Sequence, residues 1–125
     1  MTSDLFSVKG KIVLITGSTR GLGYEMAKGF SEVGAVVIIN GRDANTVQRV
    51  AKELRDAGGK AKGYSFDVAR EDEVAENIGR MEKEVGPIGV LINNAGIHRR
   101  GPLTELSYED WKTVIEVNLN AVFLV

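Results

Sequence analysis

Thr16-Gly17-Ser18-Thr19-Arg20-Gly21-Leu22-Gly23 is a glycine-rich stretch between a short apolar run and a segment with apolar residues every three or four positions. Glycines let the backbone turn sharply and approach a pyrophosphate closely, and a helix that begins there presents free N–H groups and a positive dipole end to the anion. A strand, this loop and a helix, in that order, predict a dinucleotide-binding loop. A tight strand-to-helix turn without a ligand is the alternative that the glycine spacing leaves open.

The segments on either side of this loop are predicted to be a strand and a helix. Residues 11–16 form a short β-branched run, which is typical of a buried strand. Residues 21 to about 33 are predicted to form a helix that ends at Gly34. Its apolar face comprises Leu22, Met26, Ala27 and Phe30.

The rest of the chain continues this alternation. Strands are predicted at residues 35–40, 60–66 and 89–93, and helices at residues 44 to about 57, about 70 to 85, and from near 108 onward. Asp43 and Ser107 are the expected N-caps of the first and last of these helices. Val74, Ile78 and Met81 are expected to face inward. The last helix carries the apolar residues Trp111, Val114, Ile115, Leu119 and Val122, with Trp111 in the core rather than stacked on a ligand.

Such alternation implies a parallel sheet with helices on both faces. The predicted fold class is α/β, a doubly wound Rossmann-type sheet with strand order 3-2-1-4, forming one dinucleotide-binding domain over residues 1–125. The sequence stops within an apolar helical segment, Ala121 to Val125, so we expect the fold to be incomplete at its C-terminus.

Composition excludes several function classes. A net charge of −1 argues against a nucleic-acid partner. No apolar run approaches the roughly 18 residues of a membrane-spanning helix, and the first ten residues lack the features of a signal peptide. The chain has no Cys, so we expect no disulfide, no thiol nucleophile and no metal site, and the cytoplasm is the expected location.

Four separated motifs resemble the short-chain dehydrogenase/reductase family. They are the Gly-x-x-x-Gly-x-Gly spacing of residues 17–23, Asp67-Val68, Asn93-Asn94-Ala95-Gly96 and Val117-Asn118. Within the family, residues 4–7, 94–100 and 102–105 look like those of gluconate 5-dehydrogenases. The resemblance implies an oxidoreductase that transfers a hydride between a nicotinamide cofactor and a sugar acid, gluconate or 5-ketogluconate. It also implies a homo-oligomer, either a dimer or a tetramer.

By resemblance, the glycine loop contacts the phosphates and adenosine ribose of the cofactor through Gly17, Ser18, Thr19, Arg20, Gly21, Leu22 and Gly23. Further cofactor contacts are expected at Asn40, Gly41 and Arg42, where the next strand ends and where an NAD site would carry an acidic residue for the ribose 2′-hydroxyl. Gly41 leaves room there, and Arg42 and Arg20 supply cations suited to a phosphate, so NADP is expected rather than NAD. A merely solvated Arg42 is the alternative. Asp43 could bind an NAD ribose, but helix capping explains it more simply.

The resemblance places further cofactor contacts after later strands. Asp67 would hold the adenine edge with Val68 beside the ring, although Asp67 could instead be a helix cap. The expected nicotinamide-side contacts are Asn94, Ala95, Gly96 and Val117, whereas Asn93 could be purely structural.

Asn118 is the one catalytic residue that the resemblance assigns within this sequence. In the family the matching Asn bends its helix, and its backbone carbonyl holds a water that contacts the catalytic Lys. Its apolar neighbours predict a buried side chain, and a hydrogen-bonded structural Asn is the alternative. Arg99 and Arg100 are candidates for the substrate carboxylate, or else solvated loop charges, while a catalytic role for His98 is disfavoured.

By the resemblance, the family's catalytic Ser and Tyr-x-x-x-Lys pair would lie after residue 125. Tyr108 and Lys112 have the literal spacing, but they precede Asn118 and follow no Ser-bearing strand. We therefore expect the chain to represent the N-terminal part of an enzyme and to be inactive alone. Another short-chain reductase, such as a 3-oxoacyl-thioester reductase, and a non-catalytic nucleotide-binding module are the competing hypotheses.

Overall fold

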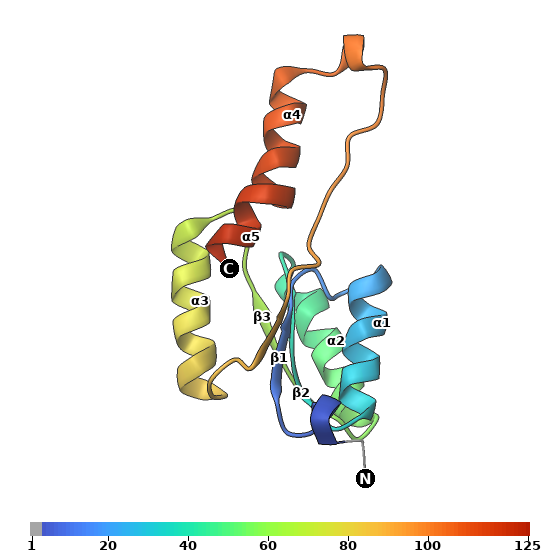
Figure 1. Cartoon of the computed structure of the whole chain (residues 1–125), viewed down its shortest axis with the longest axis vertical. Helices are drawn as coiled ribbons and strands as arrows, with labels where there is room; N and C mark the ends of the chain where they lie inside the picture. The colour runs from blue at the N-terminus through green and yellow to red at the C-terminus, as the bar shows by residue number, and fades with distance from the viewer. Residues whose placement is uncertain (1–3) are drawn as a thin grey trace.

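A computed structural model describes residues 4–125 as a four-stranded parallel sheet with helices on both faces (Figure 1). The strands are β1 (Ile12–Ile15), β2 (Val36–Gly41), β3 (Lys60–Ser65) and β4 (Val90–Ile92). Their order in the sheet is β3-β2-β1-β4, and Ile15 is in register with Ile39 on one side and Ile92 on the other. The predicted fold class and strand order are confirmed.

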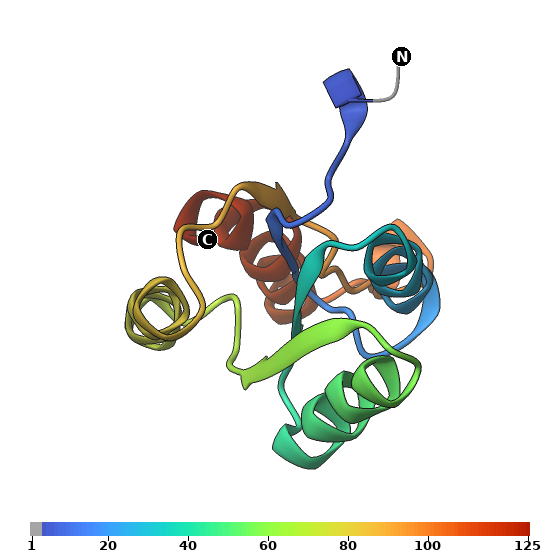
Figure 2. The same ribbon diagram turned by 90° about the horizontal axis from the view of Figure 1, so that it is seen from below.

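Alternating side chains divide the core between the two faces of the sheet. Val13 and Ile15 of β1 pack with α1 (Gly21–Glu32) and α2 (Ala44–Asp56). Leu14 lies on the opposite face, beneath α3 (Glu71–Glu84) and α5 (Ala121–Leu124). Figure 2 shows this division from below, with α1 and α2 on one side of the strands and α3 on the other.

Two helices, α2 and α4 (Tyr108–Ile115), begin at the capping residues that the sequence predicted for them. The Asp43 carboxylate accepts a hydrogen bond from the Thr46 N–H at 2.7 Å and caps α2. The Ser107 hydroxyl accepts from the Asp110 N–H at 3.0 Å and caps α4. Both predicted caps are confirmed. Two short 3₁₀ turns, η1 (Asp4–Phe6) and η2 (Leu103–Glu105), lie outside the predicted elements.

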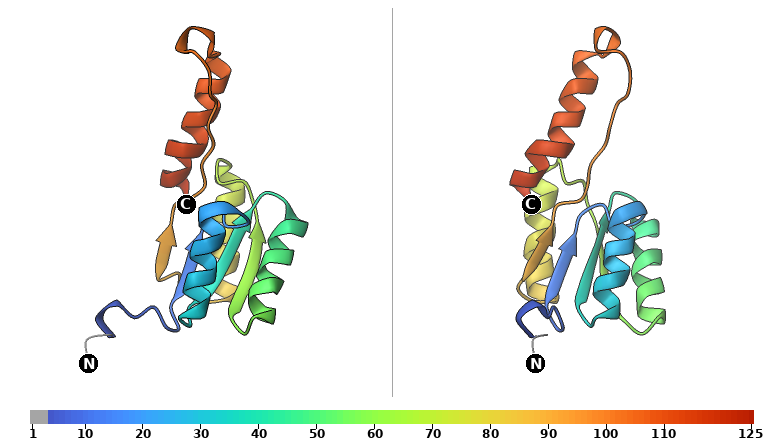
Figure 3. Two further views of the ribbon diagram at one scale, coloured as in Figure 1. Left: turned by 90° about the vertical axis from the view of Figure 1, so that its right-hand side faces the viewer. Right: turned by 45° about the vertical axis from the view of Figure 1, so that its right-hand side comes forward.

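The last predicted helix is not continuous. A π-helical segment, η3 (Glu116–Asn120), separates α4 from α5, and Asn118 lies in its middle. Together with residues 93–107, α4 forms an arm that extends beyond the carboxyl ends of the strands (Figures 1 and 3). Within residues 4–125, no strand of the sheet lies beneath this arm.

Four residues of the predicted apolar helix faces are exposed, namely Leu22, Trp111, Leu119 and Val122. Trp111 of α4 is 52% exposed, because its helix extends past the sheet that would have covered it. Leu22, in the first turn of α1, is also exposed, whereas Gly23 and Ala27 of the same helix are buried. No helix within residues 4–125 is both long and apolar enough to cross a membrane.

Candidate functional site

The glycine loop between β1 and α1 is shaped by close contacts that exclude side chains. Gly17 and Gly21 adopt φ values of +61° and +59°, which favour glycine. A Cβ at Gly17 would lie 2.9 Å from the Ala95 Cα, and one at Gly23 would meet the Gly17 carbonyl oxygen and lie 2.5 Å from the Asn94 amide nitrogen. The loop thus forms a bare backbone cradle at the carboxyl end of the sheet.

The N-terminus of α1 opens onto this cradle. Arg20 is its N-cap and makes no side-chain capping bond. The N–H of Tyr24 donates to the Arg20 carbonyl at 3.3 Å, whereas the N–H groups of the preceding turn have no helical acceptor. These donors and the positive end of the helix dipole suit an anion such as a pyrophosphate.

The end of β4 is fastened to the glycine loop. The Asn94 amide donates to the carbonyls of Thr16 and Gly17, each at 3.0 Å. The Thr16 hydroxyl accepts the backbone N–H groups of Asn94 and Ala95, also at 3.0 Å. Asn94 and Ala95 therefore lie against the loop, near where the resemblance placed them.

Thr16 was not predicted as a site residue. It is buried, and its hydroxyl joins β1 to the segment after β4. A hydroxyl residue at the end of a buried strand, directly before the first loop glycine, is the sequence signal that could have identified it.

Ser18 and Asn40 differ from the expectation of direct cofactor contact. Both side chains are buried, and the Ser18 hydroxyl donates to the Ile15 carbonyl at 2.7 Å while accepting the Asn40 N–H at 3.0 Å. The Asn40 carboxamide is also bonded within the protein, in part to the Gly17 N–H. Because their polar atoms point inward, any role of these two side chains in binding is indirect.

The predicted ribose region lies where β2 ends. A Cβ at Gly41 would lie 2.8 Å from the Thr19 methyl group and 3.2 Å from a Val47 methyl group, so Gly41 does not leave the room that was expected there. Arg20 and Arg42 are exposed, and neither forms an ion pair within residues 4–125. Hydrogen bonds from Thr46 lower the pKa of Asp43, consistent with its capping role. The guanidinium groups of Arg20 and Arg42 are therefore available to bind an anionic ligand.

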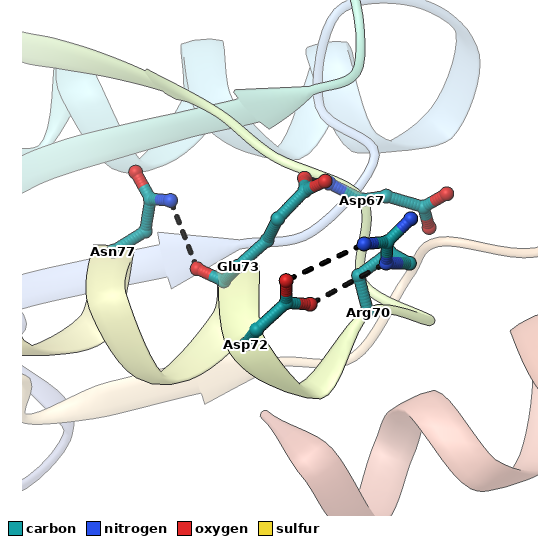
Figure 4. Close-up of polar contacts among 5 residues, drawn as sticks. All are labelled: Asp67, Arg70, Asp72, Glu73 and Asn77. Atoms are coloured by element: carbon teal, nitrogen blue, oxygen red, sulfur yellow. Dashed lines mark hydrogen bonds and ion pairs between the residues drawn. The ribbon is translucent and has the colours of Figure 1, made fainter.

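The turn after β3 is held by Asp67 and Glu73 (Figure 4). The Asp67 carboxylate accepts the Ala69 N–H at 2.9 Å, and the Asp67 N–H donates to the Glu73 carboxylate at 2.8 Å. Asp67 does not cap α3, whose N-cap is Arg70 without a side-chain capping bond. Its second carboxylate oxygen, Oδ2, makes no hydrogen bond within residues 4–125. Val68 is buried in the core beneath α3.

Asn118 is exposed, contrary to the expectation of a buried side chain. Both polar atoms of its side chain are nevertheless bonded, because Oδ1 accepts from the Ile97 N–H and Nδ2 donates to the Ile97 carbonyl, each at 2.8 Å. Gly96 lies beside it, and a Cβ there would be 3.4 Å from Asn118 Oδ1. The neighbouring Val117 is partly buried against the core beneath α3.

The predicted substrate-binding arginines lie on the arm. Arg99 pairs with Asp110 of α4 at 3.4 Å and donates to the His98 carbonyl. Arg99 and Arg100 are exposed, and the described part of the chain shows no hydrogen bond from either to the glycine loop. The structure does not bring these two residues together with the predicted cofactor contacts.

Comparison with known proteins identifies a family for this chain. The model of the short chain dehydrogenase family matches residues 11–125. The chain is 48% identical, over its whole length, to a 2-dehydro-3-deoxy-D-gluconate 5-dehydrogenase of Formosa agariphila, and covers 48% of that protein. It is 44% identical, over 98% of its length, to a gluconate 5-dehydrogenase of Gluconobacter oxydans, again covering 48% of it.

The fold is similar to that of a solved gluconate 5-dehydrogenase from Burkholderia cenocepacia, in complex with NADP and tartrate. The two superpose with a TM-score of 0.92 at 42% identity, over 96% of this chain and 47% of the other. The chain therefore spans about half the length of the relatives that it matches.

Proposed function

The chain belongs to the short-chain dehydrogenase family, and from that premise we propose that the carboxyl edge of its sheet binds NADP in preference to NAD. The glycine cradle carries the proposal, because a side chain at Gly17 or Gly23 would collide with Ala95, Asn94 or the loop itself, and this tight turn leads directly into the N-terminus of α1, as in a dinucleotide-binding loop. Arg42 and Arg20 support the phosphorylated cofactor, since they offer positive charge, and Gly41 carries no carboxylate. The similar solved enzyme is in complex with NADP.

Each part of the site has a task in this proposal. The loop from Gly17 to Gly23 and the α1 N-terminus would hold the phosphates, and the free carboxylate oxygen of Asp67 would bind the adenine edge. Asn94 and Ala95 would form the wall beside the nicotinamide ribose, because they are already fastened to the loop. When bound, the nicotinamide supplies or accepts a hydride.

We further propose that the whole protein reduces or oxidises a sugar acid, such as 5-ketogluconate or gluconate. The names of the relatives support this substrate class. Arg100 is the better candidate for the substrate carboxylate, because the Arg99 guanidinium already pairs with Asp110. Asn118 is proposed as a catalytic residue on resemblance alone. Assembly into a homo-oligomer belongs to the same proposal, and location in the cytoplasm stays a prediction.

Titration of the chain with NADPH and with NADH, followed by nucleotide fluorescence, tests the cofactor proposal. We expect tighter binding of NADPH. Equal or tighter binding of NADH would contradict the assignment of Gly41 and Arg42, and binding of neither would contradict the site itself.

The reaction is tested at the level of the gene and the whole protein. A Ser followed by Tyr-x-x-x-Lys beyond codon 125 would support an oxidoreductase, whereas a stop codon there would favour a nucleotide-binding module. Comparing 5-ketogluconate with a 3-oxoacyl thioester as substrates of the whole protein would then separate the two reductase hypotheses.

A further inference from the structure

Asn40 is the penultimate residue of β2, and its side chain is 1% exposed. The Oδ1 atom accepts the Gly17 N–H at 3.0 Å. The Nδ2 atom donates to the carbonyls of Phe66 at 3.2 Å and Tyr64 at 3.4 Å. One side chain therefore bonds three backbone groups, which belong to two different loops and to β3.

These partners lie at the two ends of the proposed dinucleotide site. Gly17 is the first glycine of the phosphate cradle, and Phe66 directly precedes Asp67, which is proposed to hold the adenine edge. The Asn40 backbone strengthens the first connection, because its carbonyl accepts the Ser18 N–H at 2.9 Å and its N–H donates to the Ser18 hydroxyl. Asn40 thus links the cradle to the turn after β3.

The chemistry of the position requires a carboxamide. Gly17 offers a donor, whereas Phe66 and Tyr64 offer acceptors, so the side chain needs one acceptor and an NH₂ group on the same carbon. An aspartate would turn a carboxylate towards two carbonyl oxygens, and an apolar residue would remove the bonds to all three backbone groups.

We propose that Asn40 is a positioning residue that sets the spacing between the phosphate cradle and the adenine turn, so that both engage one dinucleotide at once. The inference rests on the proposed function, because it presumes that a dinucleotide occupies this edge of the sheet. Asn40 itself touches no ligand, since its polar atoms are turned into the protein.

A comparison of a whole cofactor with a fragment tests this role. NADPH spans both ends of the site, whereas adenosine 2′-monophosphate reaches only the adenine and 2′-phosphate end. We expect Asn40→Ala to weaken NADPH binding by about tenfold or more, and to weaken binding of the fragment by much less. General destabilisation would lower both affinities by the same factor, because it only reduces the folded fraction.

Asn77→Ala is the matched control. Asn77 is also a buried asparagine, but its amide donates to the Glu73 carbonyl within α3. Equal losses for NADPH and the fragment in Asn40→Ala, or a loss no greater than in Asn77→Ala, would overturn the inference. No binding by the unaltered chain would instead overturn the proposed function, and this inference with it.

A second measurement needs no variant and covers the case in which Asn40→Ala does not fold. In the unaltered chain, adenosine 2′-monophosphate should slow hydrogen exchange at the Gly17 amide, because Asn40 transmits the ordering of the adenine turn to the cradle. Unchanged exchange at Gly17 with the fragment bound would overturn the inference.

Discussion

Asn118 and Ile97 exchange two hydrogen bonds, from the Ile97 N–H to Asn118 Oδ1 and from Asn118 Nδ2 to the Ile97 carbonyl, each 2.8 Å long. They join the π-helical segment to the chain that leaves β4, although the two residues are 21 positions apart. This link fixes the base of the arm next to Gly96, on the nicotinamide side of the proposed site.

Replacing Asn118 with alanine should free the base of the arm. The change removes both bonds to Ile97, each worth about 1 kcal/mol. We expect amide exchange at Ile97 to become faster by about fivefold or more, while exchange in β1 and β2 changes little. Hydrogen exchange measured by NMR would show this.

Asn120→Ala is the control for that experiment. Asn120 lies in the same π-helical segment, but its amide donates only to the Glu116 side chain. A similar effect at Ile97 in both variants would mean that the segment, rather than the Asn118 link, holds the loop.

Gly41→Asp should weaken NADPH binding and spare NADH, since a carboxylate at this position repels a 2′-phosphate. The structure adds a steric effect, because any Cβ at Gly41 lies 2.8 Å from the Thr19 methyl group. Gly41→Ala introduces the same Cβ without the charge. We expect only Gly41→Asp to reverse the preference in titrations with both cofactors, and an equal change in Gly41→Ala would assign the effect to crowding.

Tyr64 should make stability fall at alkaline pH. Burial, followed by the 2.6 Å hydrogen bond to Glu84 and the charge of Glu84, raises the pKa of Tyr64 from 10.0 to about 12, although Arg80 partly opposes this. Below pH 10, where the Tyr64 hydroxyl is protonated in both the folded and the unfolded chain, the stabilisation that it contributes is fully present. Between about pH 10 and 12 the unfolded chain binds fewer protons than the folded one, so the free energy of unfolding decreases as pH rises.

Denaturant unfolding across this pH range, with Tyr64→Phe for comparison, would measure the effect. The variant should be less stable by about 1 kcal/mol below pH 10, and the difference should shrink towards pH 12. Tyr24→Phe is the control, because the Tyr24 hydroxyl makes no hydrogen bond in the described part of the chain. A Tyr64→Phe difference that stays constant with pH would contradict the assigned pKa.

The sequence predicted the sheet because each strand carries its own signal. Strand runs such as residues 35–40 are apolar and end near glycines. The capping side chains of Asp43 and Ser107 each bond a backbone N–H only three positions further along the chain. Such local features can be recognised without knowing what lies beside them.

The predictions differ from the structure where the placement of a side chain depends on residues that are distant in the sequence. Asn40 is turned inward by hydrogen bonds to Gly17 and Phe66, 23 and 26 positions away, and no local pattern reveals that geometry. Trp111 follows a correct helical pattern, but its helix extends past the sheet. Periodicity identifies the apolar face of a helix but not whether another layer covers it.

The 125-residue chain should not turn over 5-ketogluconate with NADPH. Without a positioned acid/base residue, the rate falls by about 10²–10⁴-fold. Tyr108 does not supply one, because the Lys112 ammonium lies over its exposed ring at 5.1 Å and pairs with Glu109 at 2.9 Å. Robust turnover that Tyr108→Phe abolishes would show that this pair is catalytic after all.

The purified chain should self-associate through the side of the molecule that carries α5 and β4. In this structure β4 is an edge strand, and an unpaired parallel edge leaves N–H and C=O groups open to another chain. Three apolar side chains in α5 and just before it are also exposed, namely Leu119, Val122 and Phe123, and Phe123 is 90% exposed. Burying one such aromatic side chain would contribute about 1.5–3 kcal/mol to association.

Sedimentation at several concentrations, together with a dye that reports apolar surface, tests this expectation. We expect the average mass to rise with concentration, and Phe123→Ser to lower both the association and the dye signal. Phe6→Ser is the matched control, because Phe6 is 85% exposed in η1, which lies near the amino ends of the strands and away from α5 (Figure 3). A monomer at every concentration that unfolds cooperatively and binds no dye would show that β4 and the apolar side of α5 need no partner. Equal effects of the two substitutions would show that association comes from exposed aromatic side chains in general.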